Sequence, residues 1–142
     1  MFSQLKEVLN YFKLIFMNLK FKNYWVIFGL IQVILAFCLC LCPIANTPVR
    51  IPHLDKLFHF FAYLLLTFYQ IQIHGVRKSK LIFMFFCIQG ILIEILQLFT
   101  GYRSFEWWDM AANASGSLYA IYFCYGLNPN ILNRIEKLTL KN

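Results

Sequence analysis

Four long stretches of the chain contain almost no charged residues. Each is about as long as the roughly 20 residues that an α-helix needs to cross a hydrocarbon core about 30 Å thick. They cover residues 24–45, 57–76, 81–102 and 110–127, and the only charged residue in them is Glu94 in the third. The thirteen Leu, Ile and Phe residues between positions 81 and 99 offset the cost of inserting one acid, because each contributes about −0.3 to −0.6 kcal/mol near a helix centre.

Composition excludes an ordinary soluble domain. Hydrophobic residues make up 61% of the 142 residues and charged residues 13%, about half the charged fraction of a typical soluble protein. A soluble four-helix bundle would show a polar face at a period of 3.6 residues, and the first stretch offers only Gln32. We therefore predict an all-α, polytopic membrane protein with four transmembrane helices.

The net charge of +7 predicts an orientation rather than a nucleic-acid partner. Three Lys or Arg residues flank the stretches on one side, and the other ten lie on the opposite side. Because positive residues gather in short cytoplasmic segments, we expect a multi-pass protein with both termini in the cytoplasm. The ten residues on that side are Lys6, Lys13, Lys20, Lys22, Arg77, Lys78, Lys80, Arg134, Lys137 and Lys141.

Residues 1–23 form a separate segment at the N-terminus. Their apolar residues follow the i, i+3, i+4, i+7 spacing of one helical face, and lysines recur on another. This pattern predicts an amphipathic helix lying on the cytoplasmic face of the bilayer, with a helix folded back on the ends of the spans as the alternative. The predicted organisation is 1–23 for this helix, 24–127 for the transmembrane domain and 128–142 for a cytoplasmic tail.

Polar residues recur at helical spacing near one end of each of the last three spans. Because residues four and seven apart share a helical face, each span should carry a polar stripe. The predicted topology places the three stripes in the outer half of the bilayer, where they should face the bundle interior and bind one another. Their members are Asp55, Lys56, His59 and Tyr63, then Gly90, Glu94, Gln97 and Gly101, and finally Asp109, Asn113, Gly116 and Ala120.

Specific pairings follow from these stripes as hypotheses. We expect Asp55 to pair with Arg103 across the outer mouth, and Glu94 to accept a hydrogen bond from His59, whose other ring nitrogen faces Asp55. Glu94 and His59 are the candidate acid and base. Asp55, His59 and Glu94 have the donor atoms that suit zinc or manganese, but the sequence offers no fourth ligand, so we predict no metal and no cofactor.

Taken together, these polar residues resemble those of the VanZ-like family of membrane proteins. The resemblance covers roughly residues 24–127. It implies a bacterial integral membrane protein of about four spans, located in the cytoplasmic membrane. The family's namesake is associated with resistance to the glycopeptide teicoplanin. The residues that carry the resemblance, and that we take as the candidate binding site, are Asp55, Lys56, His59, Tyr63, Glu94, Gln97, Arg103, Asp109, Asn113 and Gly116.

Three classes of function remain open. The first is a non-catalytic envelope protein that binds a lipid headgroup or a cell-wall precursor and so changes glycopeptide susceptibility. The second is an intramembrane enzyme or lipid transporter that uses Glu94 and His59 as acid and base. The third is a structural subunit of a membrane assembly, with another membrane protein as its partner. Trp107 and Trp108 are expected to anchor the outer interface.

Overall fold

The computed structural model describes residues 19–42, 54–101, 105–127 and 130–140. The structure is all-helical, with 90% helix and no strand in the described part of the chain. This confirms the predicted all-α class. The helices are α2 (Lys22–Leu41), α3 (Leu54–His74), α4 (Ser79–Phe99), α5 (Trp107–Leu127) and α6 (Ile131–Thr139), with a short 3₁₀ helix η1 (Val76–Lys78) before α4.

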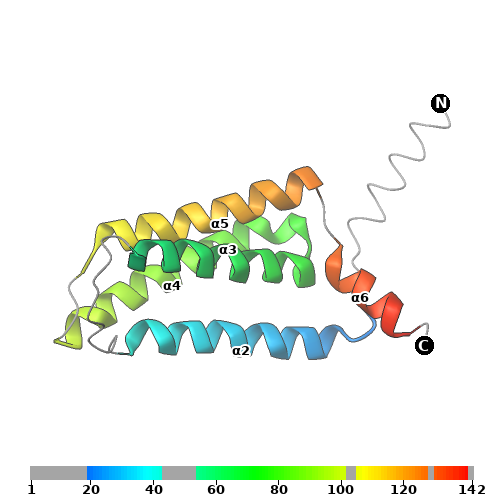
Figure 1. Cartoon of the computed structure of the whole chain (residues 1–142), viewed down its shortest axis with the longest axis horizontal. Helices are drawn as coiled ribbons and strands as arrows, with labels where there is room; N and C mark the ends of the chain where they lie inside the picture. Colours follow the sequence, from blue (N-terminus) through cyan, green and yellow to red (C-terminus); the bar gives the residue numbers. More distant parts are fainter. Residues whose placement is uncertain (1–18, 43–53, 102–104, 128–129, 141–142) are drawn as a thin grey trace.

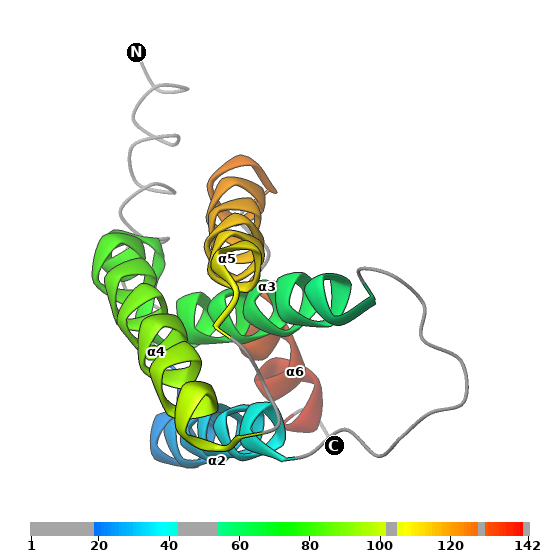
Figure 2. The ribbon, with the colours of Figure 1, turned by 90° about the vertical axis from the view of Figure 1, so that its left-hand side faces the viewer.

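Helix α3 lies at the centre of the bundle and contacts each of the other α-helices that the structure describes. Its most extensive interface is with α5 (Figures 1 and 2). The four long helices alternate in direction, so that α2 and α4 end where α3 and α5 begin (Figure 1). Gly75, with a φ of 84° that favours glycine, reverses the chain between α3 and α4. The three polar stripes are consequently brought to the same end of the bundle.

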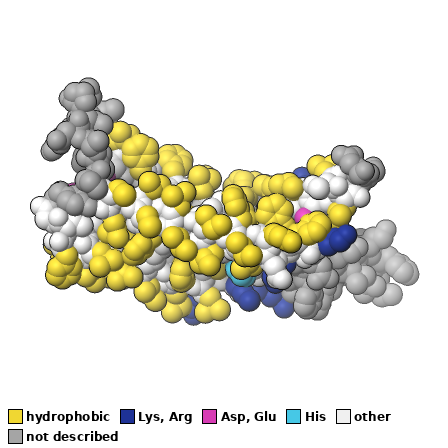
Figure 3. Space-filling view, turned by 90° about the horizontal axis from the view of Figure 1, so that it is seen from below, with side chains coloured by type: hydrophobic (Ala, Val, Ile, Leu, Met, Phe, Trp, Pro, Cys, Tyr) yellow, Lys and Arg dark blue, Asp and Glu magenta, His cyan; other side chains and the backbone are white. Residues whose placement is uncertain are grey.

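The face of the bundle shown in Figure 3 is largely apolar among the described residues. Helix α2 buries only Gly29 and exposes large apolar side chains along its length, including Ile27, Leu30 and Leu39. A soluble monomer rarely exposes so much continuous apolar surface. Lipid contact accounts for it, because hydrocarbon chains solvate such side chains.

Two segments of the described chain are long and apolar enough to cross a membrane, Lys22–Leu41 and Val76–Phe99. Helices α3 and α5 are less apolar because each carries several polar residues, and these are turned inward. Thr67 and Gln72 are buried on α3, and Asn113 and Ser117 are buried on α5. The structure thus supports a membrane protein with two clear candidate spans, and the count of four remains a prediction.

The observed helices differ by a few residues from the uncharged stretches. Helix α5 begins at Trp107 rather than near Met110, so Asp109 lies in its first turn, where the helix dipole favours an acidic residue. Helix α2 ends at Leu41, before Pro43. The predicted amphipathic helix falls almost entirely within residues 1–18, outside the described residues.

The predicted cytoplasmic tail contains a helix that the sequence analysis did not identify. Helix α6 is strongly amphipathic, and Leu132 packs in a small apolar cluster with Leu19 and Ile73. Its Glu136 is only 4% exposed. The carboxylate accepts hydrogen bonds from the backbone N–H of Lys20 at 2.7 Å and of Phe21 at 2.9 Å, and from the Trp25 indole at 2.7 Å. Together these contacts fasten the start of α2 to α6.

This arrangement predicts a pH-dependent contribution of Glu136 to stability. Burial raises the pKa of Glu136, but the hydrogen bonds from Phe21, Lys20 and Trp25 lower it by a larger amount. The pKa of Glu136 therefore lies below its ordinary value of 4.5. A group whose pKa is lower in the folded state stabilises the fold above its unfolded pKa, and the stabilisation is lost as pH falls through the folded pKa.

We therefore expect Glu136→Gln to lower the free energy of unfolding by about 1.5 to 3 kcal/mol at neutral pH, the usual worth of a hydrogen bond to a charged group. Below pH 4 the difference should shrink. Thermal unfolding of both forms in detergent from pH 3 to 7 measures it. A constant difference over that range would contradict the proposed role of the charge.

Candidate functional site

Six polar residues of the three stripes are buried inside the bundle, as expected for groups that lipid cannot solvate. The buried residues are His59 and Tyr63 on α3, Glu94 and Gln97 on α4, and Asp109 and Asn113 on α5. The most exposed of them is His59, with a relative exposure of 6%. Seven residues at this end of the bundle form what we call the polar cluster: Asp55, Lys56, His59, Glu94, Glu106, Asp109 and Asn113.

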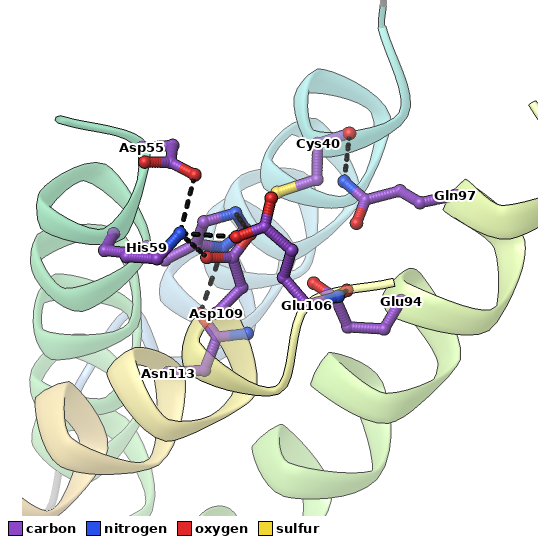
Figure 4. Close-up of polar contacts among 9 residues, drawn as sticks. Cys40, Asp55, His59, Glu94, Gln97, Glu106, Asp109 and Asn113 are labelled. Carbon is purple, nitrogen blue, oxygen red and sulfur yellow. Dashed lines mark hydrogen bonds and ion pairs between the residues drawn. The ribbon is translucent and has the colours of Figure 1, made fainter. Parts of the chain in front are cut away.

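Lys56 binds three carboxylates of the polar cluster. Its Nζ lies 2.6 Å from Glu106 Oε2, 3.0 Å from Asp55 Oδ2 and 3.2 Å from Asp109 Oδ1 (Figure 4). Glu106 directly precedes α5, and Asp109 lies in the first turn of that helix. One ammonium group therefore links the start of α3 to the start of α5.

His59 is held between two residues of α5. Its Nδ1 lies 3.1 Å from Asn113 Oδ1, and its Nε2 lies 3.5 Å from Asp109 Oδ2. Because an amide oxygen can only accept, Nδ1 carries the proton and donates it to Asn113. The prediction that His59 faces Asp55 was wrong, since the facing carboxylate belongs to Asp109.

Glu94 is fully buried, with no exposed surface. Its Oε2 accepts a hydrogen bond from the backbone N–H of Glu106 at 2.9 Å. This places the carboxylate at the N-terminal end of α5, where unpaired backbone N–H groups and the helix dipole favour negative charge. The sequence predicted that Glu94 accepts a hydrogen bond from His59. The hydrogen bond to Glu94 Oε2 comes instead from the backbone of Glu106, although Glu94 and His59 lie in the same cluster.

Gln97 connects the neighbourhood of the polar cluster to α2. Its Nε2 donates to the backbone carbonyl of Cys40 at 2.8 Å (Figure 4). The sequence could not show this contact, because a backbone acceptor leaves no signal in residue type. All five cysteines lie within the described residues, and none of them forms a disulfide there.

Two residues mark the limits of the sequence prediction. Arg103 lies outside the described residues, so its expected pairing with Asp55 stays a prediction, while Asp55 itself binds Lys56.

Glu106 was not among the predicted site residues. Its position three residues before Asp109, at the boundary of an uncharged stretch, was the available signal.

Small and polar residues bring α3 and α5 into close contact beside the polar cluster. Thr67 Oγ1 donates to Ser117 Oγ at 2.9 Å, and both side chains are fully buried. Gly116 lies against the backbone of α3 at Phe60 and Leu64. This glycine positions the two helices that carry Lys56, His59, Asp109 and Asn113.

The composition of the polar cluster suits cation binding and proton transfer. Its four carboxylates surround one lysine and one histidine, so negative charge is in excess. Two sets of three side chains bring ligand atoms within 4.8 Å of one another, and they share Asp109: His59 with Glu94 and Asp109, and Asp55 with Glu106 and Asp109.

A protein-family model for VanZ/LLP1 matches residues 2–131. The chain belongs to the VanZ/LLP1 family. The match includes all of α2–α5 and also takes in the N-terminal segment, which the resemblance from individual residues did not reach. No curated protein and no solved structure matches the chain. Membership of the VanZ/LLP1 family, together with the two apolar helices, identifies a membrane protein.

Proposed function

We propose that this VanZ-like protein binds a lipid headgroup or a cell-wall precursor at the polar cluster and thereby changes the susceptibility of a bacterium to teicoplanin-type glycopeptides. The observation that carries the proposal is the concentration of buried ionisable groups at one end of a lipid-facing bundle. Such groups are costly in a membrane and are kept where they serve a site or a pathway.

The proposed topology places this site toward the outside of the cell. Of the described Lys and Arg residues, only Lys56 lies at the cluster end, and the others lie at or near the opposite end. Positive residues favour the cytoplasmic side, so the chain is a multi-pass protein of the cytoplasmic membrane with cytoplasmic termini. Residues at the opposite end include Lys20, Lys22, Arg77, Lys78, Lys80, Arg134 and Lys137.

Two tryptophans support an interfacial location of the polar cluster. Trp107 and Trp108 begin α5 beside Glu106 and are 70% and 74% exposed. Tryptophan is enriched at the boundary between hydrocarbon and headgroups. In this arrangement lipid headgroups, lipid-linked precursors and glycopeptides all meet at the depth of the polar cluster.

Glycopeptide susceptibility of a bacterium that expresses the chain tests this proposal. We expect the wild-type chain to raise the teicoplanin concentration that stops growth, and Glu94→Gln to abolish the whole increase at equal membrane abundance, because the amide removes the charge while keeping the shape. His59→Gln should act alike. The matched control is His74→Gln, which changes the histidine at the other end of α3. If the wild-type chain confers no change, the glycopeptide role is excluded.

The second candidate is an intramembrane enzyme or lipid transporter with Glu94 and His59 as acid and base. The observation in its favour is that Asn113 orients the imidazole, as a proton-transferring histidine requires. The two candidate functions differ in which substitutions should abolish function. A binding site should lose function in Trp107→Ala or Trp108→Ala as well as in Glu94→Gln, whereas an acid–base site should depend on the buried pair alone.

A further inference from the structure

We propose that the polar cluster holds one divalent transition-metal ion, Mn²⁺ or Zn²⁺, with His59 Nε2 and the carboxylates of Glu94 and Asp109 as its protein ligands. The three residues come from three different helices, and each is at most 6% exposed. Their ligand atoms lie within 4.8 Å of one another. Metal–donor bonds of about 2.0 to 2.2 Å are reached from there by small side-chain rotations.

The orientation of His59 is that of a metal ligand. Its Nδ1 donates to Asn113 Oδ1 at 3.1 Å, so Nε2 is the ring nitrogen that a metal ion would use. A ligating histidine commonly donates its other ring N–H to a fixed acceptor in this way. Nε2 lies 3.5 Å from Asp109 Oδ2, so the two donor atoms are close enough to bind the same ion.

Charge in the polar cluster favours a divalent cation. Asp55, Glu94, Glu106 and Asp109 bring four negative charges, and Lys56 brings one positive charge. Lys56 occupies Asp109 Oδ1, while the second oxygen of that carboxylate faces His59. The ion and the ammonium group therefore use different oxygens.

Buried polar atoms beside the ligands have no hydrogen-bond partner among the described residues. They are Tyr63 Oη and Asn113 Nδ2, on side chains that are 1% and 2% exposed. Both face Gly90, one turn before Glu94: a Cβ there would lie 3.0 Å from the amide nitrogen and 3.6 Å from the hydroxyl. Two unpaired donors next to a three-ligand site suit a metal-bound water or a phosphate oxygen, since such sites keep a position open.

The sequence predicted no metal, whereas we infer one. The difference arises from Asp109, which the sequence did not identify as a ligand. The stripe on α5 gave no indication that its first acid would lie opposite His59. The inference deepens the proposed function, because a divalent ion lets an acidic site bind the phosphate of a lipid headgroup or precursor. It rests on the proposed function only for that ligand, since metal binding itself is measured without lipid or antibiotic.

Mn²⁺ binding to the purified full chain in detergent tests the inference. After chelator treatment, titration followed by electron paramagnetic resonance should show one bound Mn²⁺ per chain, which Zn²⁺ displaces. Mn²⁺ is the primary probe because thiolates such as those of Cys38 and Cys42 prefer softer ions. Pulsed resonance should detect coupling to one imidazole nitrogen, a readout that requires no variant.

Substitutions identify the ligands. Even outer-shell changes cost 10- to 100-fold in metal affinity, so we expect about 100-fold or more from His59→Gln, Glu94→Gln or Asp109→Asn. The matched control His74→Gln, at the other end of α3, should retain both the affinity and the nitrogen coupling. Unfolding temperature with and without Mn²⁺ shows whether each variant is folded.

Three results would overturn the inference. The first is that the wild-type chain binds no Mn²⁺ in the titration. The second is that Mn²⁺ binds but pulsed resonance detects no coupling to an imidazole nitrogen. The third is binding that depends on Asp55 and Glu106 but not on Glu94, which would place the ion in the all-carboxylate set instead. A wild-type chain that binds no Mn²⁺ but still raises the teicoplanin concentration that stops growth would reject the metal and leave the proposed function standing.

Discussion

Gly116→Ala is expected to destabilise the bundle more than any other single-methyl change in the described residues. A Cβ at this position would overlap the carbonyl oxygen of Phe60 and lie 3.1 Å from the backbone nitrogen of Leu64. The obstacle is backbone, which cannot rotate away, so α3 and α5 must separate. We expect a loss of about 3 kcal/mol or more, at or above the top of the usual range for overpacking.

Gly126→Ala is the matched control for this substitution. Gly126 lies on the same helix with open space at its Cβ position, and alanine is the better helix former by about 0.8 to 1 kcal/mol. Thermal unfolding in detergent should therefore show a large decrease for Gly116→Ala and no decrease for Gly126→Ala. Equal unfolding temperatures would mean that α3 and α5 are not in close contact at this point.

Lys56→Met is expected to have an effect of comparable size. The ammonium group neutralises Asp55, Glu106 and Asp109 at 2.6 to 3.2 Å, and its side chain is only 20% exposed. Without it the three carboxylates repel one another, and Asp109, whose side chain is 2% exposed, loses its cation. Removing one partner of a buried ion pair costs about 3 to 5 kcal/mol.

Acidification distinguishes this charge effect from lost packing. Burial raises the pKa of Asp55, but its hydrogen bonds and ion pair with Lys56 bring that pKa below its ordinary value of 3.8, so the stability deficit of Lys56→Met against the wild-type chain should narrow as pH falls below about 4. The matched control Lys80→Met changes an exposed lysine at the other end of the bundle, for which the described residues show no ion pair. A deficit that stays constant with pH would argue that the apolar stem of Lys56, and not its charge, is what matters.

The sequence predicts the long helices well because long uncharged, apolar stretches are easy to recognise. An uncharged stretch of about 20 residues has few alternatives to a helix, and the four stretches correspond to α2–α5 within a few residues. The same argument missed α6, since a nine-residue helix has no hydropathy signal. Its apolar residues at positions 131, 132, 135 and 138 repeat at helical spacing and were the available evidence.

Membership of the candidate site was also predictable, whereas its pairings were not. Helical spacing showed that Glu94 and Gln97 share a face, as do Asp109 and Asn113, and all four are buried. Spacing says nothing about how far one helix is rotated or shifted against the next. For that reason His59 was assigned to Asp55 when it faces Asp109, and the ends of α4 and α5 were not seen to meet through Glu94 and the backbone of Glu106.

The Glu136 contacts bear on how the bundle is assembled. They join Lys20 to a residue 116 positions later in the chain. During synthesis α2 is therefore made long before Glu136 on α6. Until α6 has been made, only contacts with neighbouring helices such as α3 can stabilise the position of α2. The first described helix to be made therefore completes its contacts with Glu136 only after the last described helix has been made.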